Sequence, residues 1–129
     1  MKLHLKDLSS ALLKFHRGLL QYQTELVIKE DQRSYSPYEL LNLSLNDSRF
    51  SWLRKFSEII VQIDTFVDDK KNMPLNIQEL ICVVKNLINI NSINSAELLQ
   101  AIKTDASIMV PLAEIRKNIL IIEKLFTPT

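Results

Sequence analysis

Glycine is nearly absent from this chain: Gly18 is the single glycine among 129 residues. β-Hairpins, tight turns and phosphate-binding loops depend on glycine, because they need backbone angles or close approaches that other residues rarely adopt. Sheets and glycine-rich loops are therefore disfavoured. With 47% hydrophobic and 24% charged residues, the chain is expected to fold as one all-α domain over residues 1–129.

The stretch from Asp47 to Asp69, DSRFSWLRKFSEIIVQIDTFVDD, has the clearest helical pattern in the sequence. At ~100° per residue, its apolar side chains fall within an arc of roughly 140°, which is wider than a coiled-coil seam needs. We therefore expect a long central helix that contacts more than one neighbour, in a bundle of five to six helices. The arc contains Trp52, Leu53, Phe56, Ile59, Ile60, Ile63, Phe66 and Val67.

The first helix should span about Leu5 to Glu30, because leucine and aromatic residues recur there at alternating spacings of three and four. This heptad stripe is long enough to pack inside a bundle or against a coiled-coil-like partner. Its members are Leu5, Leu8, Leu12, Phe15, Leu19, Tyr22 and Leu26.

A short second helix is marked by the sequence Ser36-Pro37-Tyr38-Glu39. The sequence combines a hydroxyl cap, a proline at the first helical position and a carboxylate at the third, which is an unusually complete helix start. The helix should run to about Leu45. Its buried side is expected to contain Leu40, Leu41 and, at its end, Leu45.

Further apolar stripes predict three more helices. The fourth begins at Pro74 or is capped by Asn76, the fifth follows an Asn- and Ser-rich turn, and the last follows Asp105. Pro111 leaves two alternatives for the last helix. We favour a start near Asp105 with a bend at the proline over a start at Pro111 itself.

Motifs that carry chemistry are missing from the sequence. A metal site in a bundle needs converging carboxylates and imidazoles, but neither His4 nor His16 has a carboxylate at the Glu-x-x-His offset. His16 is expected at a helix flank or partly buried. There is no nucleophile elbow, phosphate loop, zinc-protease motif or pair of cysteines. We therefore expect no cofactor and no metal, and we favour a non-enzymatic role over catalysis.

One polar set lies beside the apolar arc of the central helix. Ser57 and Asp64 lie at one edge of this arc, with Arg54 further round the same side. They could line a cleft or pair with a partner across an interface. The alternative is that they cap neighbouring helix ends or make intramolecular hydrogen bonds.

Three aromatic residues, Tyr35, Tyr38 and Trp52, flank the connections between helices. Tyrosine and tryptophan dominate the energetics of many protein interfaces, so these are the residues that we expect in a partner hot spot if one exists. As residues of the core or of packed loops they would need no such role.

Charge and hydropathy exclude several partners. Sixteen basic and fifteen acidic residues give a net charge of +1, so no global field attracts nucleic acid or an anionic membrane. No apolar run approaches the ~18 residues of a membrane span. Cys82 has no second cysteine for a disulfide and is expected to be a buried small hydrophobe. These features predict a protein of the reducing cytoplasm.

The pieces SPYELL, NDSRFSWLR and SEIIVQID, followed later by AIKTDASIMVPLAEIRKNI, resemble a family of small all-helical bacterial proteins with no established function. The resemblance covers about half of the chain. It implies a compact helical domain of a bacterial cytoplasm, and it supplies no activity, cofactor or catalytic residue.

Two functions compete on these observations. The leading hypothesis is a protein-interaction module that binds a protein partner or forms a homo-oligomer, because the first and last helices carry long apolar stripes. The alternative is a small-ligand-binding protein or a cryptic enzyme with a site inside the bundle near Trp52, Ser57 and Asp64. A large exposed apolar patch would favour the first, and a closed pocket of ~300 Å³ or more would favour the second.

Overall fold

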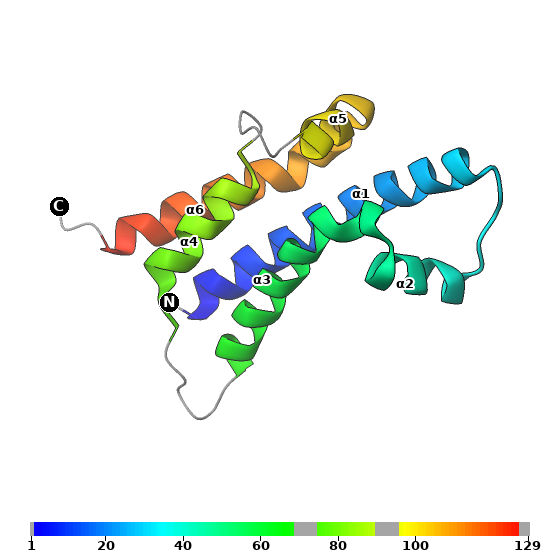
Figure 1. Cartoon of the computed structure of the whole chain (residues 1–129). Coiled ribbons are helices and arrows are strands. Elements are labelled where there is room, and N and C mark those ends of the chain that lie inside the picture. Colours follow the sequence, from blue (N-terminus) through cyan, green and yellow to red (C-terminus); the bar gives the residue numbers. More distant parts are fainter. Residues whose placement is uncertain (1, 69–74, 90–95, 127–129) are drawn as a thin grey trace.

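The computed structural model describes residues 2–68, 75–89 and 96–126, and it contains no strand within these ranges. This confirms the all-α prediction. Six α-helices and two short 3-10 turns follow one another in the described residues (Figure 1): α1 (Lys2–Asp31), α2 (Pro37–Asn46), η1 (Ser48–Phe50), α3 (Ser51–Asp68), α4 (Ile77–Leu87), α5 (Ala96–Thr104), η2 (Ala106–Ile108) and α6 (Met109–Phe126).

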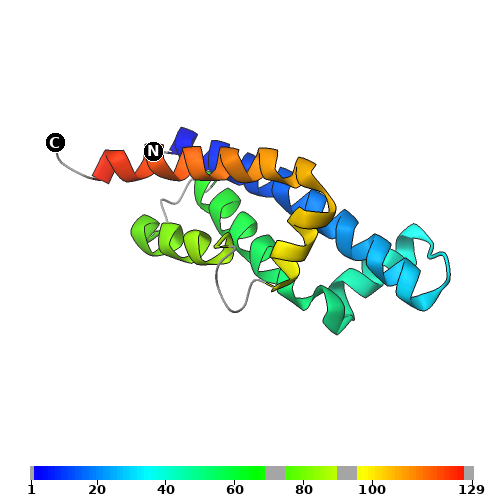
Figure 2. The same ribbon diagram turned by 90° about the horizontal axis from the view of Figure 1, so that it is seen from above.

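Helix α1 lies between the two other long helices, α3 and α6, and packs along both (Figures 1 and 2). Opposite edges of its buried arc face the two neighbours. Ser9 reaches Asp64 of α3, whereas Lys14 reaches Glu114 of α6. Helix α3 contacts both α1 and α4, so it has more than one neighbour, as its broad arc predicts. The position between the two other long helices, which the sequence pattern assigned to the helix from Asp47, is occupied by α1, because α6 packs along α1 and not along α3.

The core is one cluster of buried apolar side chains to which every α-helix except α2 contributes a fully buried residue. At the α1–α3 contact the rings of Phe15 and Phe56 meet edge to face, with centroids 5.7 Å apart and planes at 71°. None of the helices in the described ranges has the length and apolar character needed to cross a membrane.

The helix expected from Asp47 begins with a tighter turn than predicted. Asp47 Oδ1 accepts a hydrogen bond from the backbone N–H of Arg49 at 2.8 Å and caps η1, and α3 follows from Ser51. The helix continues to Asp68, close to the predicted end. Asp69 lies outside the described residues.

The start of α2 is as predicted, but its burial is not. Ser36 and Glu39 form the capping box, with both hydrogen bonds at 3.2 Å. The expectation that Leu41 and Leu45 face the core is wrong, because these side chains are 57% and 62% exposed, and Leu40 is only half-buried. The reason is position: α2 lies beyond the bundle and packs chiefly against η1 (Figure 1).

Two further expectations concern α4. Asn76 Oδ1 accepts from the backbone N–H of Glu79 at 3.0 Å, so the cap at Asn76 is confirmed as the start of this helix. Cys82 was expected to be buried, but it is exposed. It lies on the opposite face of α4 from the buried residues Leu80 and Val84.

The last helix starts near Asp105, as favoured, but its geometry changes before the proline. Asp105 Oδ1 accepts from the backbone N–H of Ser107 at 3.0 Å and caps η2, which leads into α6 at Met109. Pro111 is thus the third residue of α6. The N–H groups of a first helical turn have no intrahelical acceptor, so the proline removes no hydrogen bond there.

Candidate functional site

Polar side chains connect α1 to α3 along their antiparallel contact. Ser9 Oγ donates to Asp64 Oδ1 at 2.5 Å near one end of the contact, and Trp52 Nε1 donates to Gln23 Oε1 at 3.0 Å near the other. Ser9 and Gln23 are only 5% and 4% exposed, so these hydrogen bonds satisfy polar groups that water does not reach.

The middle pair of this series is His16 with Ser57, whose Nε2 and Oγ atoms are 3.0 Å apart. Burial lowers the pKa of His16, so the neutral imidazole is favoured at pH 7. A serine beside a neutral histidine is the start of a nucleophilic site. However, Ser57 lies in the interior of α3, where the backbone N–H groups are used by the helix and cannot form an oxyanion hole. The pair joins α1 to α3, as the other two pairs do.

Arg49 holds the C-terminal end of α1 in place. Its guanidinium donates to Asp31 through two hydrogen bonds of 3.0 and 3.1 Å, and to Asp47 at 2.8 Å. Tyr35 Oη donates to the same Asp31 at 2.5 Å. The hydrogen bonds from Arg49 lower the pKa of Asp47 to about 2, and Arg49 and Tyr35 together lower the pKa of Asp31. The cluster ties α1, the following loop and η1 together.

This cluster predicts a loss of stability in acid. The folded-state pKa of Asp47 is about 2 against an ordinary value of 3.8, so the unfolded chain binds the proton more tightly than the folded protein does. The stabilisation is therefore complete above about pH 4 and declines as the pH falls towards 2. Urea midpoints between about pH 2 and pH 6 should show that Arg49→Gln is less stable than the wild type at pH 6 and similar to it near pH 2.

The matched control for this prediction is Arg17→Gln, because Arg17 is exposed and forms no ion pair within the described ranges. It should leave the pH profile unchanged. A constant difference between Arg49→Gln and the wild type at every pH would contradict the role given to the carboxylates.

Arg54 supports the C-terminal end of α2. Its Nη2 donates to the backbone oxygen of Asp47 at 2.7 Å and its Nε to that of Ser44 at 3.4 Å. These carbonyls lie at the C-terminal end of α2, where helix carbonyl groups lack intrahelical partners. Arg54 is therefore a helix cap, which is the alternative that the sequence pattern allowed.

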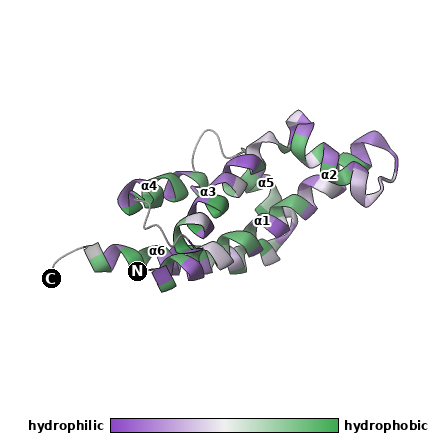
Figure 3. Cartoon of the chain, turned by 90° about the horizontal axis from the view of Figure 1, so that it is seen from below, coloured by the Kyte–Doolittle hydropathy of each residue, from purple (hydrophilic) through white to green (hydrophobic). Residues whose placement is uncertain are grey.

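The outer face of α2 is apolar and exposed. We define the α2 face as Tyr38, Leu41 and Leu45, which follow one another at spacings of three and four and are 79%, 57% and 62% exposed. Glu39, the one charged residue of α2, is paired with Arg33 at 2.7 Å. In Figure 3, α2 lies at the opposite end of the molecule from the last turns of α6. The α2 face is thus uncharged and lies apart from the core.

None of the six predicted site residues lines either of two hollows found among the described residues. Five of them have intramolecular hydrogen-bond partners, and Tyr38 projects from α2. The hollows, of about 340 Å³ between α3 and α4 and about 460 Å³ between α4 and α6, are lined by other residues. The five residues with intramolecular hydrogen bonds are Tyr35, Trp52, Arg54, Ser57 and Asp64. A role for these five residues and Tyr38 in an interface with another protein stays a prediction.

Several residues of the site could not be selected from sequence. Gln23 and Arg49 find partners far away in the chain, and no local pattern indicates such pairs. The exposure of Leu41 and Leu45 also depends on where α2 lies. Among the described residues, no group of three His, Cys, Asp or Glu side chains is placed to hold a metal ion.

Comparisons with protein-family models, curated proteins and solved structures find no match for this chain. The resemblance to a helical bacterial family therefore stays a prediction.

Proposed function

We propose that this protein is an interaction module that self-associates through the α2 face. One observation carries the proposal: α2 is capped and anchored at both ends, yet it buries none of its ten residues. The capping box holds its first turn, and Arg54 binds carbonyl groups at its last turn. An isolated helix of this length is marginal in water, so these contacts are what keep it formed.

A preformed helix with an exposed apolar face is suited to docking. The backbone of α2 is already ordered, so docking through this helix costs less conformational entropy than docking through a segment that must first fold. Tyr38 supplies a large aromatic surface of the kind that dominates interface energetics. Leu41 and Leu45 extend this surface along one side of the helix.

The chemistry of the α2 face favours a second copy of the same chain. Two α2 helices that pair antiparallel about a two-fold axis would place Tyr38 of one copy opposite Leu45 of the other, with the two Leu41 side chains near the axis. No charge lies on the face, so no like charges meet across the axis, and Glu39 is already paired with Arg33. Three side chains from each copy form less than a standard interface of ~800 Å² per partner, so the dimer should be weak.

The proposal includes a non-enzymatic role, a bacterial source and a cytoplasmic location. The first is supported by the absence of catalytic motifs from the sequence, and the other two rest on the sequence pattern and the family resemblance. The balanced charge of the chain, +1 overall, is the reason to prefer a protein partner over nucleic acid.

Sedimentation velocity tests the proposal directly. The average mass of the wild type should rise towards that of a dimer between about 10 μM and 1 mM, the range expected for a weak association. The double variant Leu41→Asp/Leu45→Asp should stay monomeric over the whole range, because burying two carboxylates without partners opposes docking.

Val61→Asp is the matched control. Val61 lies on α3 and is 61% exposed, against 62% for Leu45, but it is not on the α2 face. The Val61→Asp protein should dimerise as the wild type does. Circular dichroism should show that this control and the Leu41→Asp/Leu45→Asp variant both remain helical. A wild type that stays monomeric throughout, or equal loss of dimer in the control, would contradict the proposal.

A further inference from the structure

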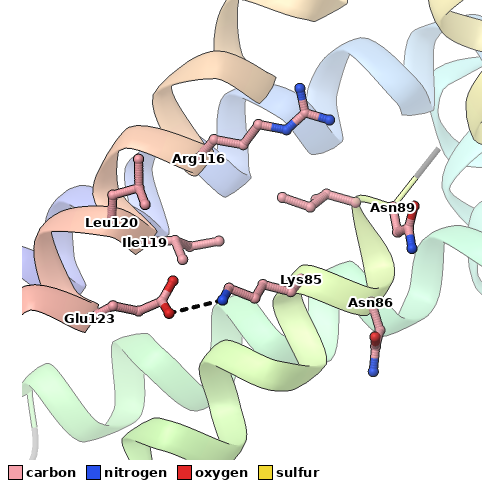
Figure 4. A pocket seen from close by; sticks show the side chains of 8 residues that line it. Lys85, Asn86, Asn89, Arg116, Ile119, Leu120 and Glu123 are labelled. Atoms are coloured by element: carbon pink, nitrogen blue, oxygen red, sulfur yellow. Dashed lines mark hydrogen bonds and ion pairs between the residues drawn. The ribbon is translucent and has the colours of Figure 1, made fainter. Parts of the chain in front are cut away.

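A groove lies between α4 and α6 (Figure 4). Figure 1 shows α4 towards the end of the molecule away from α2. The volume of the groove is about 460 Å³, within the ~300–1,000 Å³ typical of small-ligand sites. Its walls come from α4 with the two residues that follow it, and from the middle of α6. The lining residues are Lys85, Asn86, Ile88, Asn89, Arg116, Ile119, Leu120 and Glu123.

The floor of the groove is apolar. Ile88 and Ile119 are 4% and 3% exposed, so their side chains are packed into the core. Leu120, in contrast, is 60% exposed and stands at the edge of the groove. Figure 4 shows Ile119 and Leu120 along the α6 side, between Arg116 and Glu123. An apolar ligand body at this place would cover the side chain of Leu120, which now faces water.

The charges of the groove are distributed unevenly. Lys85 Nζ and Glu123 Oε2 form an ion pair at 2.9 Å, which closes one end. Arg116 precedes Glu123 by seven residues, so it lies about two turns, or ~10 Å, away along α6. Arg116 forms no ion pair with any of the residues that the structure describes. The end of the groove near Arg116 thus carries an uncompensated positive charge.

From this arrangement we propose that the groove between α4 and α6 binds a small amphipathic carboxylate. The carboxylate pairs with the guanidinium of Arg116, which can donate two parallel hydrogen bonds to it. The apolar part of the ligand lies over Ile119 and Leu120. At the far end Lys85 is already paired with Glu123, so it is not available to a second carboxylate, and a monocarboxylate fits better than a dicarboxylate.

Octanoate is a suitable probe, because it combines one carboxylate with a flexible apolar chain. Titration of the ¹⁵N-labelled full-length protein at pH 7 and constant ionic strength should give saturable shifts of the backbone amides of Asn86, Arg116, Ile119 and Leu120. Octanol and octylammonium carry the same chain with no charge or a positive charge. Each should bind at least about tenfold more weakly than octanoate, a factor that corresponds to ~1.4 kcal/mol.

Arg116→Gln tests the role of the guanidinium. It should weaken octanoate binding about tenfold while leaving the rest of the amide spectrum unchanged, and the latter result would show that the fold is intact. Arg17→Gln, which removes an exposed arginine from α1, is the matched control and should bind octanoate as the wild type does.

Three results would overturn this inference: no saturable shift up to about 10 mM octanoate, equal binding of octanol or octylammonium, or unchanged affinity in Arg116→Gln. The groove and the α2 face share no residue. Leu41→Asp/Leu45→Asp should therefore bind octanoate normally, so the test of the groove is independent of the test of self-association.

Discussion

Phe56→Ala is expected to lower the free energy of unfolding by about 3–5 kcal/mol, a large part of the stability of a small domain. Phe56 is 2% exposed and lies edge to face with Phe15, which is fully buried. Truncation removes the ring contact and leaves a cavity between α1 and α3, which the backbones of two long helices cannot close by a small shift.

Urea unfolding at pH 7, followed by circular dichroism, measures this loss. Val61→Ala on the same helix is the control, because Val61 is 61% exposed and its truncation should change stability by no more than about 0.5 kcal/mol. A cost below about 1 kcal/mol for Phe56→Ala would mean that the α1–α3 contact is not the centre of the core.

Gly18→Leu is expected to destabilise the protein by about 1–3 kcal/mol, although leucine favours helix more than glycine does by up to ~1 kcal/mol. A Cβ atom at position 18 would lie 3.2 Å from Cγ1 of Ile108, which is a tight contact for the first atom of any side chain. Ile108 is 2% exposed and cannot move into solvent. A leucine side chain would therefore push η2 away from α1.

A double-mutant cycle separates crowding from other effects of the substitution. Ile108→Ala makes room beside position 18, so Gly18→Leu should cost less, or become favourable, when Ile108 is alanine. Each variant is measured by urea unfolding. Additive effects of the two substitutions, or a stabilising Gly18→Leu on its own, would show that the contact does not limit this position.

Features that depend on neighbours in sequence were predictable. The capping box at Ser36, the cap at Asn76 and the buried arc of α3 are set by residues one to four positions apart, and side-chain chemistry at that range is readable from sequence. The helical nature of the chain and the number of helices follow from such local patterns. No tertiary information was needed for them.

Features that depend on the arrangement of helices were not predictable. An apolar stripe indicates that a helix face can be buried but not which helix will cover it, and on α2 the stripe is left exposed. The same limit applies to Arg49, whose partner Asp31 belongs to another helix. The use of Gly18 is a third case, because its close neighbour Ile108 is distant in the chain.

The α1–α3 pair also has to choose one alignment along its length. Apolar stripes made of similar residues could slide by a helical turn, about 5.4 Å, with little change in buried area. A shift in one direction would bring Ile60 opposite Ser9 and Leu53 opposite His16, so the buried Ser9 hydroxyl and the half-buried His16 ring would both lose their hydrogen-bond partners. A buried group such as the Ser9 hydroxyl costs about 1–3 kcal/mol when it has no partner, so the polar pairs favour one of the registers that the apolar residues alone leave open.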